Sequence, residues 1–252
     1  MPDLLAAIDP GLAWSTYLNM GLMVLVGACL QGVSGLGFAM FCSPIAALWF
    51  PVLVPGPLLA LSCPLALLSF MRERKTVDWS TASLAVCGRL LGTAVAMLCL
   101  LALSGKTLSI FFALLILSGV ALSVRGWSLR VTPVTAILAG VASGLMGTIT
   151  SAGAPPLAIA MQSMPAQRLR PTLGLVFFGG ASISLAALAY VGRMSHAHLQ
   201  LSLALAPWML IGFFLSAQLR QFSALRSLKP ILLSLAAVSA VLVLVQALFP
   251  SQ

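Results

Sequence analysis

The chain has 252 residues, of which 61% are hydrophobic and only 7% are charged, and its mean hydropathy is +1.11. Soluble domains carry roughly a quarter charged residues, so this composition excludes a soluble domain and indicates an integral membrane protein. The net charge of +9 would point to nucleic-acid binding in a soluble protein. Here the basic residues lie in short loops between apolar runs, which is typical of topology signals, and no nucleic-acid partner is expected.

Ten apolar segments follow one another along the chain, and their continuous rather than alternating pattern predicts helices. They cover residues 14–33, 36–50, 54–71, 80–103, 107–124, 132–150, 152–164, 171–191, 199–219 and 229–249. A spanning helix needs about 20 apolar residues, and segments 36–50 and 152–164 are shorter. Each either tilts within the protein or forms a half-helix. The sequence therefore predicts an all-α polytopic membrane protein with about 8–10 transmembrane segments in the lipid bilayer.

The basic residues help to choose between the two ends of this range. If all ten segments cross and the acidic N-terminus is outside, ten of the 13 basic residues lie in cytoplasmic loops. If the two short segments dip in and return, the basic residues divide almost evenly between the two sides. The positive-inside rule favours ten crossings, and an eight-span arrangement with two re-entrant pieces stays open. We expect a multi-pass protein of a bacterial inner membrane, without a cleaved signal peptide.

Two stretches of sequence repeat each other. Residues 27–44 read GACLQGVSGLGFAMFCSP and residues 139–156 read AGVASGLMGTITSAGAPP, and two glycines and the final proline coincide position for position. Each copy interrupts an apolar run with helix-breaking residues. The repeat predicts two inverted transmembrane repeats, 1–126 and 127–252, with Gly-rich broken helices. Paired interruptions of this kind mark the substrate site of many transporters.

The glycine-rich breaks supply most of the candidate substrate-binding residues. Because lipid offers no hydrogen bonds, an unwound stretch must line a cavity or be buried in protein, and a restarting helix presents free N–H groups to an anion. The candidates are Gln31, Ser34, Gly35, Gly37 and Ser43 in the first copy, and Ser143, Gly147, Thr148, Thr150, Ser151 and Gly153 in the second. The alternative is that these small residues only allow helices to pack closely.

Arg89 is the charge that stands out. It lies about nine residues into the segment that begins near Ser80, which is roughly 14 Å along a helix and close to the bilayer centre. No acidic residue lies in any apolar segment to pair with it, so a substrate anion is the expected counter-charge. The alternative is that the helix begins later and Arg89 extends to the interface.

The sequence gives no sign of an enzyme. An intramembrane enzyme would need paired carboxylates, a His cluster or a Ser/Lys-type dyad, and apart from Arg89, and Lys229 at the very start of the last one, the apolar segments hold no acidic or basic residue. The five cysteines lack metal-ligand spacing. No catalytic residue, metal site or cofactor is predicted. All four acids lie outside the apolar segments, so coupling through an intramembrane carboxylate is not expected either.

Three stretches together resemble the TauE/SafE family of sulfite exporters over essentially the whole chain. They are GVSGLGFAMFCSP, GLMGTITSAGAPP and the basic loop RERKTVDW at 72–79. The resemblance implies a secondary transporter that exports small organic or sulfur-containing anions such as sulfite, sulfoacetate or related sulfonates. The family's GxGGG signature is incomplete, since Phe38 and Ala39 follow Gly37. The anion, the direction, a coupling ion and homodimerisation stay open, as do a channel-like facilitator and a non-transporting scaffold.

Overall fold

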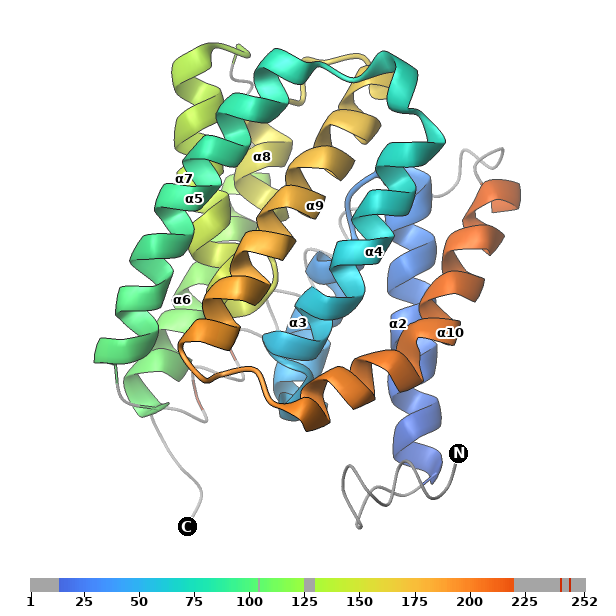
Figure 1. The fold of residues 1–252 in the computed structure, drawn as a ribbon, viewed down its shortest axis with the longest axis vertical. Coiled ribbons are helices and arrows are strands. Elements are labelled where there is room, and N and C mark those ends of the chain that lie inside the picture. The colour runs from blue at the N-terminus through green and yellow to red at the C-terminus, as the bar shows by residue number, and fades with distance from the viewer. Residues whose placement is uncertain (1–13, 104, 125–129, 220–240, 242–244, 246–252) are drawn as a thin grey trace.

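The computed structural model describes residues 14–103, 105–124, 130–219, 241 and 245, and every regular element in these ranges is a helix (Figure 1). The elements are α2 (Trp14–Ser34), α3 (Phe38–Trp49), η1 (Pro51–Leu53), α4 (Gly56–Arg72), η2 (Arg74–Thr76), α5 (Trp79–Ala102), α6 (Gly105–Val124), α7 (Pro133–Thr150), α8 (Ala154–Ala160), α9 (Ala166–Tyr190) and α10 (His196–Leu219). The predicted all-α fold is confirmed. The boundary between the predicted halves at 126/127, and all of segment 229–249 except 241 and 245, lie outside the described residues.

Five of these helices, α2, α5, α7, α9 and α10, are long and apolar enough to cross a membrane. Their outward surfaces carry large apolar side chains, including Leu98, which is 66% exposed, and Leu203, which is 72% exposed. A contiguous exposed apolar surface is costly in water and normal in lipid. The chain is therefore a multi-pass membrane protein, as predicted.

The two short predicted segments form short helices. α3 has 12 residues and α8 has seven, so they extend about 18 Å and about 10 Å, less than the roughly 30 Å hydrocarbon core. Both nevertheless return the chain to the opposite end of the molecule. Figure 1 shows the α4–α5 and α8–α9 turns and the start of α7 at one end, and the α9–α10 connection at the other. The described basic loops thus gather at one end, as the ten-crossing topology requires.

Helix starts follow local capping chemistry. Thr132 and Thr135 form a capping box at the start of α7, with Pro133 at its first position, where the missing N–H costs nothing. Asp78 caps α5 by accepting a hydrogen bond from the Thr81 amide at 3.0 Å. That bond holds the pKa of the Asp78 carboxyl below its ordinary value, because it favours the charged form.

Glycines decide how the long helices pair. α5 packs closely on α7, and α2 packs closely on α10. A Cβ added at Gly92 would lie 2.0 Å from the Val141 carbonyl oxygen, and one added at Gly140 would lie 2.2 Å from the Ala85 carbonyl oxygen. Small residues on both faces let two backbones touch, which is a common way to join helices in lipid. The α5–α7 contact is therefore built from backbone.

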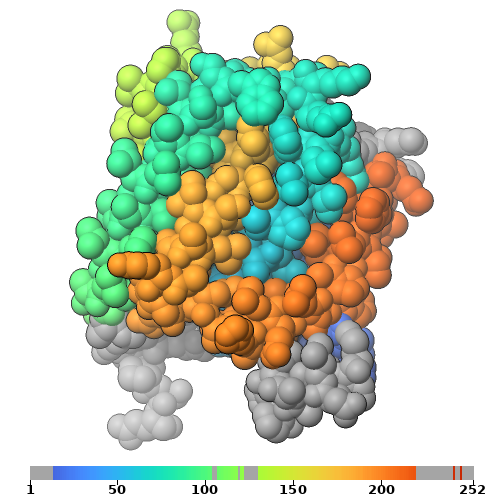
Figure 2. Space-filling model, in the orientation of Figure 1, coloured from blue at the N-terminus to red at the C-terminus, as the bar shows by residue number. Residues whose placement is uncertain are grey.

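The pairs come together around α4 and α9. α4 packs along α9, and α9 also packs on α5; Figure 2 shows α9 filling the space between α5 and α4 on one face of the molecule. One buried apolar cluster joins α2, α3, α4 and α10, and another joins α5, α7, α8 and α9. The candidate site lies where these two clusters meet.

Candidate functional site

Arg89 is buried inside the helix bundle. Its side chain on α5 is 3% exposed, its Nη1 donates a hydrogen bond to Ser143 Oγ at 2.8 Å, and its guanidinium carbon lies 5.8 Å from the centre of the Phe177 ring. Nε has no hydrogen-bond partner, and within the described residues it is the one buried side-chain nitrogen or oxygen in that condition. A buried donor without a partner is costly, which makes Arg89 the first candidate among the described residues for contact with an acceptor.

Carboxylates of the described residues do not reach this arginine. Glu73 lies near Arg170, with Oε1 and Nη1 3.8 Å apart, and Asp78 caps the start of α5. Asp78 precedes Arg89 by eleven positions, or about 16 Å along the helix. No cluster of three or more metal-ligating side chains occurs in the described part of the chain. Among the described residues, therefore, neither Glu73 nor Asp78 is placed to balance the charge of Arg89.

Glycines make room for the guanidinium. A Cβ added at Gly180 on α9 would lie 1.7 Å from Arg89 Nε, and a Cβ at Gly147 on α7 would lie 3.0 Å from Nη2. Gly144 presses on the Arg89 backbone instead, since its Cβ would lie 2.5 Å from the carbonyl oxygen. Two neighbouring helices thus lack side chains at the positions that the arginine fills.

We expect Gly180→Ala to weaken anion binding at least about tenfold, because the new methyl group would occupy the position of Nε and push the flexible guanidinium aside. Tenfold corresponds to about 1.4 kcal/mol. The adjacent Gly179→Ala is the matched control, since its Cβ would meet Val86 Cγ2 at an ordinary 3.4 Å. Anion-dependent shifts in thermal unfolding measure both. Equal shifts in the two variants would contradict the placement of Arg89 at the anion.

Beside Arg89 lies a cavity of about 30 Å³, enough for about two water molecules at 10–15 Å³ each. It is lined by residues of α2, α3, α4, α5, α8 and α9 and of the two breaks. Its walls are formed by Gln31, Gly37, Phe38, Ala39, Leu59, Ser62, Leu65, Ala66, Arg89, Ser151, Gly153, Ala154, Phe177 and Ala181. The lining combines one cation and a few amide and hydroxyl groups with a mostly apolar wall, as is usual for small-ligand sites.

The first break brings the start of α3 to this cavity. Gly35 and Gly37 have φ values of +77° and +143°, conformations that side chains other than glycine rarely adopt. They let the chain leave α2 and restart as α3. Gln31 Oε1 accepts a hydrogen bond from the Phe38 amide at 3.3 Å and so caps the new helix. The break places backbone N–H groups of α3 beside the cavity.

The second break does not offer the same donors. α8 begins Ala154-Pro155-Pro156, and proline has no N–H, so its first turn cannot present a full set of amides. Ser143 Oγ instead ties the break to the arginine, since it accepts from Arg89 and donates to the Gly153 carbonyl oxygen. The two copies of the repeat thus differ in chemistry. The first break supplies backbone amides of α3, whereas the second is bound to Ser143, the hydrogen-bond partner of Arg89.

The structure divides the predicted site residues into three groups. Those that line the cavity are Gln31, Gly37, Arg89, Ser151 and Gly153. Those that lie against the Arg89 side chain are Ser143 and Gly147. Those that lie elsewhere are Ser34, Gly35, Ser43, Thr148 and Thr150.

The third group has other contacts. Ser34 is exposed and donates to the Leu30 carbonyl oxygen at 2.8 Å. Ser43 Oγ donates to the Thr150 carbonyl oxygen and thereby joins α3 to the end of α7. Thr148 lies in a buried hydroxyl chain, 2.8 Å from Ser184 Oγ. These side chains hold the breaks and helices together rather than facing the cavity.

Most of the lining that the sequence analysis missed is apolar. It comprises Phe38, Ala39, Leu59, Ser62, Leu65, Ala66, Ala154, Phe177 and Ala181. In a chain that is 61% hydrophobic, such residues carry no signal of their own. Ser62 on α4 is the exception, because a hydroxyl group within an apolar segment is a signal that the sequence does contain.

The long apolar helices, with a buried cation beside a small cavity, define a polytopic α-helical membrane protein. The sequence model of the sulfite exporter TauE/SafE family matches residues 20–243, and the chain belongs to this family. The resemblance seen in the sequence is thus confirmed, and the family is one of membrane anion exporters rather than enzymes. Comparisons with curated proteins and with solved structures gave no match.

Proposed function

We propose that this protein is a secondary transporter that exports small sulfur-containing or organic anions, such as sulfite, sulfoacetate or related sulfonates, across a bacterial inner membrane. The observation that carries the proposal is Arg89, which lines the cavity and whose buried Nε has no hydrogen-bond partner. A buried arginine in a membrane protein usually faces a partner or a pathway. Family membership supports an anion as that partner.

The binding chemistry follows from the guanidinium. An oxyanion binds an arginine through charge-assisted hydrogen bonds, often two in parallel, and these strengthen where water is excluded. Gln31 and the first turn of α3 lie on the same cavity and supply further polar groups. A cavity of about 30 Å³ favours small ligands, so we expect sulfite-sized anions to bind best in this conformation.

The membrane potential can drive export without a coupling ion. One charge is worth about 2.3 kcal/mol per 100 mV, so a monoanion is favoured outside by roughly 50-fold per 100 mV. The described spanning helices hold no Asp or Glu, which is consistent with an export step that lacks carboxylate coupling. We propose that flux depends on voltage and not on a proton or sodium gradient.

Pseudo-symmetry offers a route for alternating access. If the halves 1–126 and 127–252 are inverted repeats, α2 corresponds to α7, α4 to α9 and α5 to α10. The α5–α7 pair then corresponds to the α10–α2 pair, and the α4–α9 pair corresponds to itself. These are the closely packed pairs in the described helices, which supports the repeat. Movement of one half against the other would then open the cavity to each side in turn.

Ligand-dependent stability of the purified wild-type protein tests the proposal. We expect sulfite or a small sulfonate to raise the unfolding temperature relative to chloride at equal ionic strength, since a ligand at 100 times its Kd adds about 2.7 kcal/mol. Voltage-driven, saturable flux of the same anion in proteoliposomes completes the test. Absence of any shift would favour a non-transporting scaffold, and flux that never saturates would favour a channel-like facilitator.

A further inference from the structure

A second and larger pocket, of about 300 Å³, lies at the end of the molecule where α4 passes into α5. We call it the loop pocket; it is lined by Met71, Arg72, Glu73, Arg74, Lys75, Thr76 and Gln167. Three of these described residues are cations and one is an acid. The positive-inside rule explains why basic residues occur on this face, but it does not explain why they surround a hollow.

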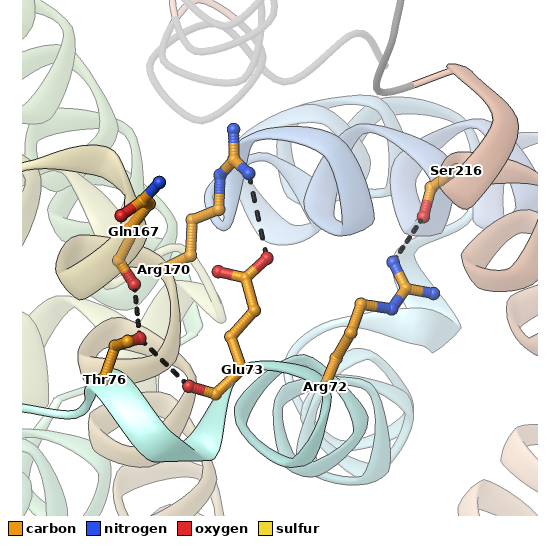
Figure 3. A network of polar contacts seen from close by, with 6 residues as sticks. All are labelled: Arg72, Glu73, Thr76, Gln167, Arg170 and Ser216. Carbon is orange, nitrogen blue, oxygen red and sulfur yellow. Dashed lines mark hydrogen bonds and ion pairs between the residues drawn. The ribbon is translucent and has the colours of Figure 1, made fainter.

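The acid of the loop pocket is offset by a further cation. Figure 3 shows the Glu73 carboxylate turned toward Arg170, which comes from α9, with Oε1 and Nη1 3.8 Å apart. Arg74 and Lys75 are exposed. The pocket and its immediate wall therefore carry a clear excess of positive charge. A cleft lined by one sign of charge concentrates ions of the opposite sign.

Hydrogen bonds fix the shape of the loop pocket. Thr76 Oγ1 lies 2.7 Å from the Gln167 carbonyl oxygen, which holds the η2 turn against the start of α9 (Figure 3). Arg72 donates to Ser216 Oγ at 3.1 Å and to the Phe213 carbonyl oxygen at 3.2 Å, which holds the end of α4 against α10. The cations are thus presented by a braced turn that joins three helices.

α4 contributes to both the loop pocket and the Arg89 cavity, with Ala66 at the cavity and Met71 at the loop pocket, and five residues of helix rise about 7.5 Å. The first break links the two regions, since a Cβ on Gly35 would lie 3.1 Å from Arg170 Cγ. The side chain that pairs with Glu73 therefore rests against the break whose other end opens on the cavity.

We propose that the loop pocket is an outer binding site for the transported anion, occupied from the cytoplasmic side before the anion reaches Arg89. This inference rests on the proposed function. The ligand class is a small oxyanion held by guanidinium and ammonium groups in a water-filled hollow. The site raises the local anion concentration and does not set the maximal rate, because Arg89 and the conformational change lie further inward.

Charge reversal at Lys75 tests the outer site. Proteoliposomes of zwitterionic lipid, with the α4–α5 loop facing radiolabelled sulfite, are assayed at low ionic strength. A unit charge about 10 Å away in water changes binding about twofold, so Lys75→Glu, a change of two charges, should raise the apparent KM about fourfold and leave the maximal rate unchanged. Lys75→Gln, a change of one charge, should raise the apparent KM about twofold. At 1 M salt, where the screening length is about 3 Å, both effects should vanish.

Arg130→Glu is the matched control, because Arg130 is also exposed and lies three residues before α7, whose start is at the same end of the molecule as the α4–α5 turn (Figure 1). Arg130 does not line the loop pocket, so this variant should change KM less than Lys75→Glu does. Equal effects of the Lys75 and Arg130 variants would overturn the outer site. An effect of Lys75→Glu seen only with anionic lipid would also overturn it and assign the loop pocket to a lipid headgroup. Absence of saturable sulfite flux in wild type would instead refute the proposed function itself.

Discussion

Replacing Arg89 with methionine is expected to abolish anion binding while leaving the unliganded protein at least as stable as wild type. The variant removes the buried Nε that has no partner, and exchanging a buried charge for an apolar side chain of similar size is often neutral or stabilising. Two charge-assisted hydrogen bonds contribute about 3–6 kcal/mol, so affinity should fall by about 100-fold or more. Thermal unfolding with and without sulfite measures both effects.

The stability without ligand and the anion-dependent shift together distinguish a ligand-binding arginine from a structural one. If Arg89 only held Ser143 in place, Arg89→Met would lower the stability of the unliganded protein and leave the anion-dependent shift intact. Arg89→Lys sharpens the comparison, because it keeps a charge but loses the planar, two-pronged donor. It should bind the anion with intermediate affinity.

Gly92→Ala is expected to destabilise the protein by about 3 kcal/mol or more, at the upper end of overpacking costs. The new methyl group would lie 2.0 Å from the Val141 carbonyl oxygen and 2.8 Å from the Leu145 amide nitrogen. Both are backbone atoms of α7, which cannot rotate away. α5 and α7 would have to separate, and the Arg89–Ser143 contact between the same helices would lengthen with them.

The sign of the effect makes this prediction demanding. Alanine is a better helix former than glycine by about 1 kcal/mol, so without the helix contact the substitution would stabilise α5. Gly179→Ala, whose Cβ would meet Val86 at 3.4 Å, should show that neutral or stabilising outcome. Both variants can be compared by the unfolding temperature in one detergent. A stable Gly92→Ala variant would mean that α5 and α7 are not in backbone contact.

Much of this fold could be read from composition and pattern. Continuous apolar runs of about 20 residues indicate membrane helices, so the membrane class and most helix positions followed directly. The prediction was least accurate at the second break, where only Ala154–Ala160 of the predicted segment 152–164 form a helix, α8. Pro155 and Pro156 lie in the first turn of α8, where proline is tolerated. Few helical residues follow them, because a turn begins at Met161. The length of an apolar run therefore overestimates the length of the helix that it contains.

The candidate site was only partly predictable. Arg89 could be singled out because a charge within an apolar segment is rare and costly, and Gln31 because it precedes a break. Ser34 and Thr148 could not be excluded, since whether a hydroxyl faces a cavity or bonds the backbone depends on packing between distant helices. Phe177 and Leu65 reach the cavity only because α9 and α4 cross beside it.

Anomalous diffraction from crystals containing selenite tests the central claim most directly. Selenite has the three oxygens and pyramidal shape of sulfite, and its selenium can be located without ambiguity. At a concentration that competes with sulfite, we predict a selenium peak in the cavity, within about 4 Å of Arg89 Nε, as hydrogen-bonded oxygens at about 3 Å require. Crystals in which the anion competes with sulfite but selenium lies only outside this cavity would contradict the account.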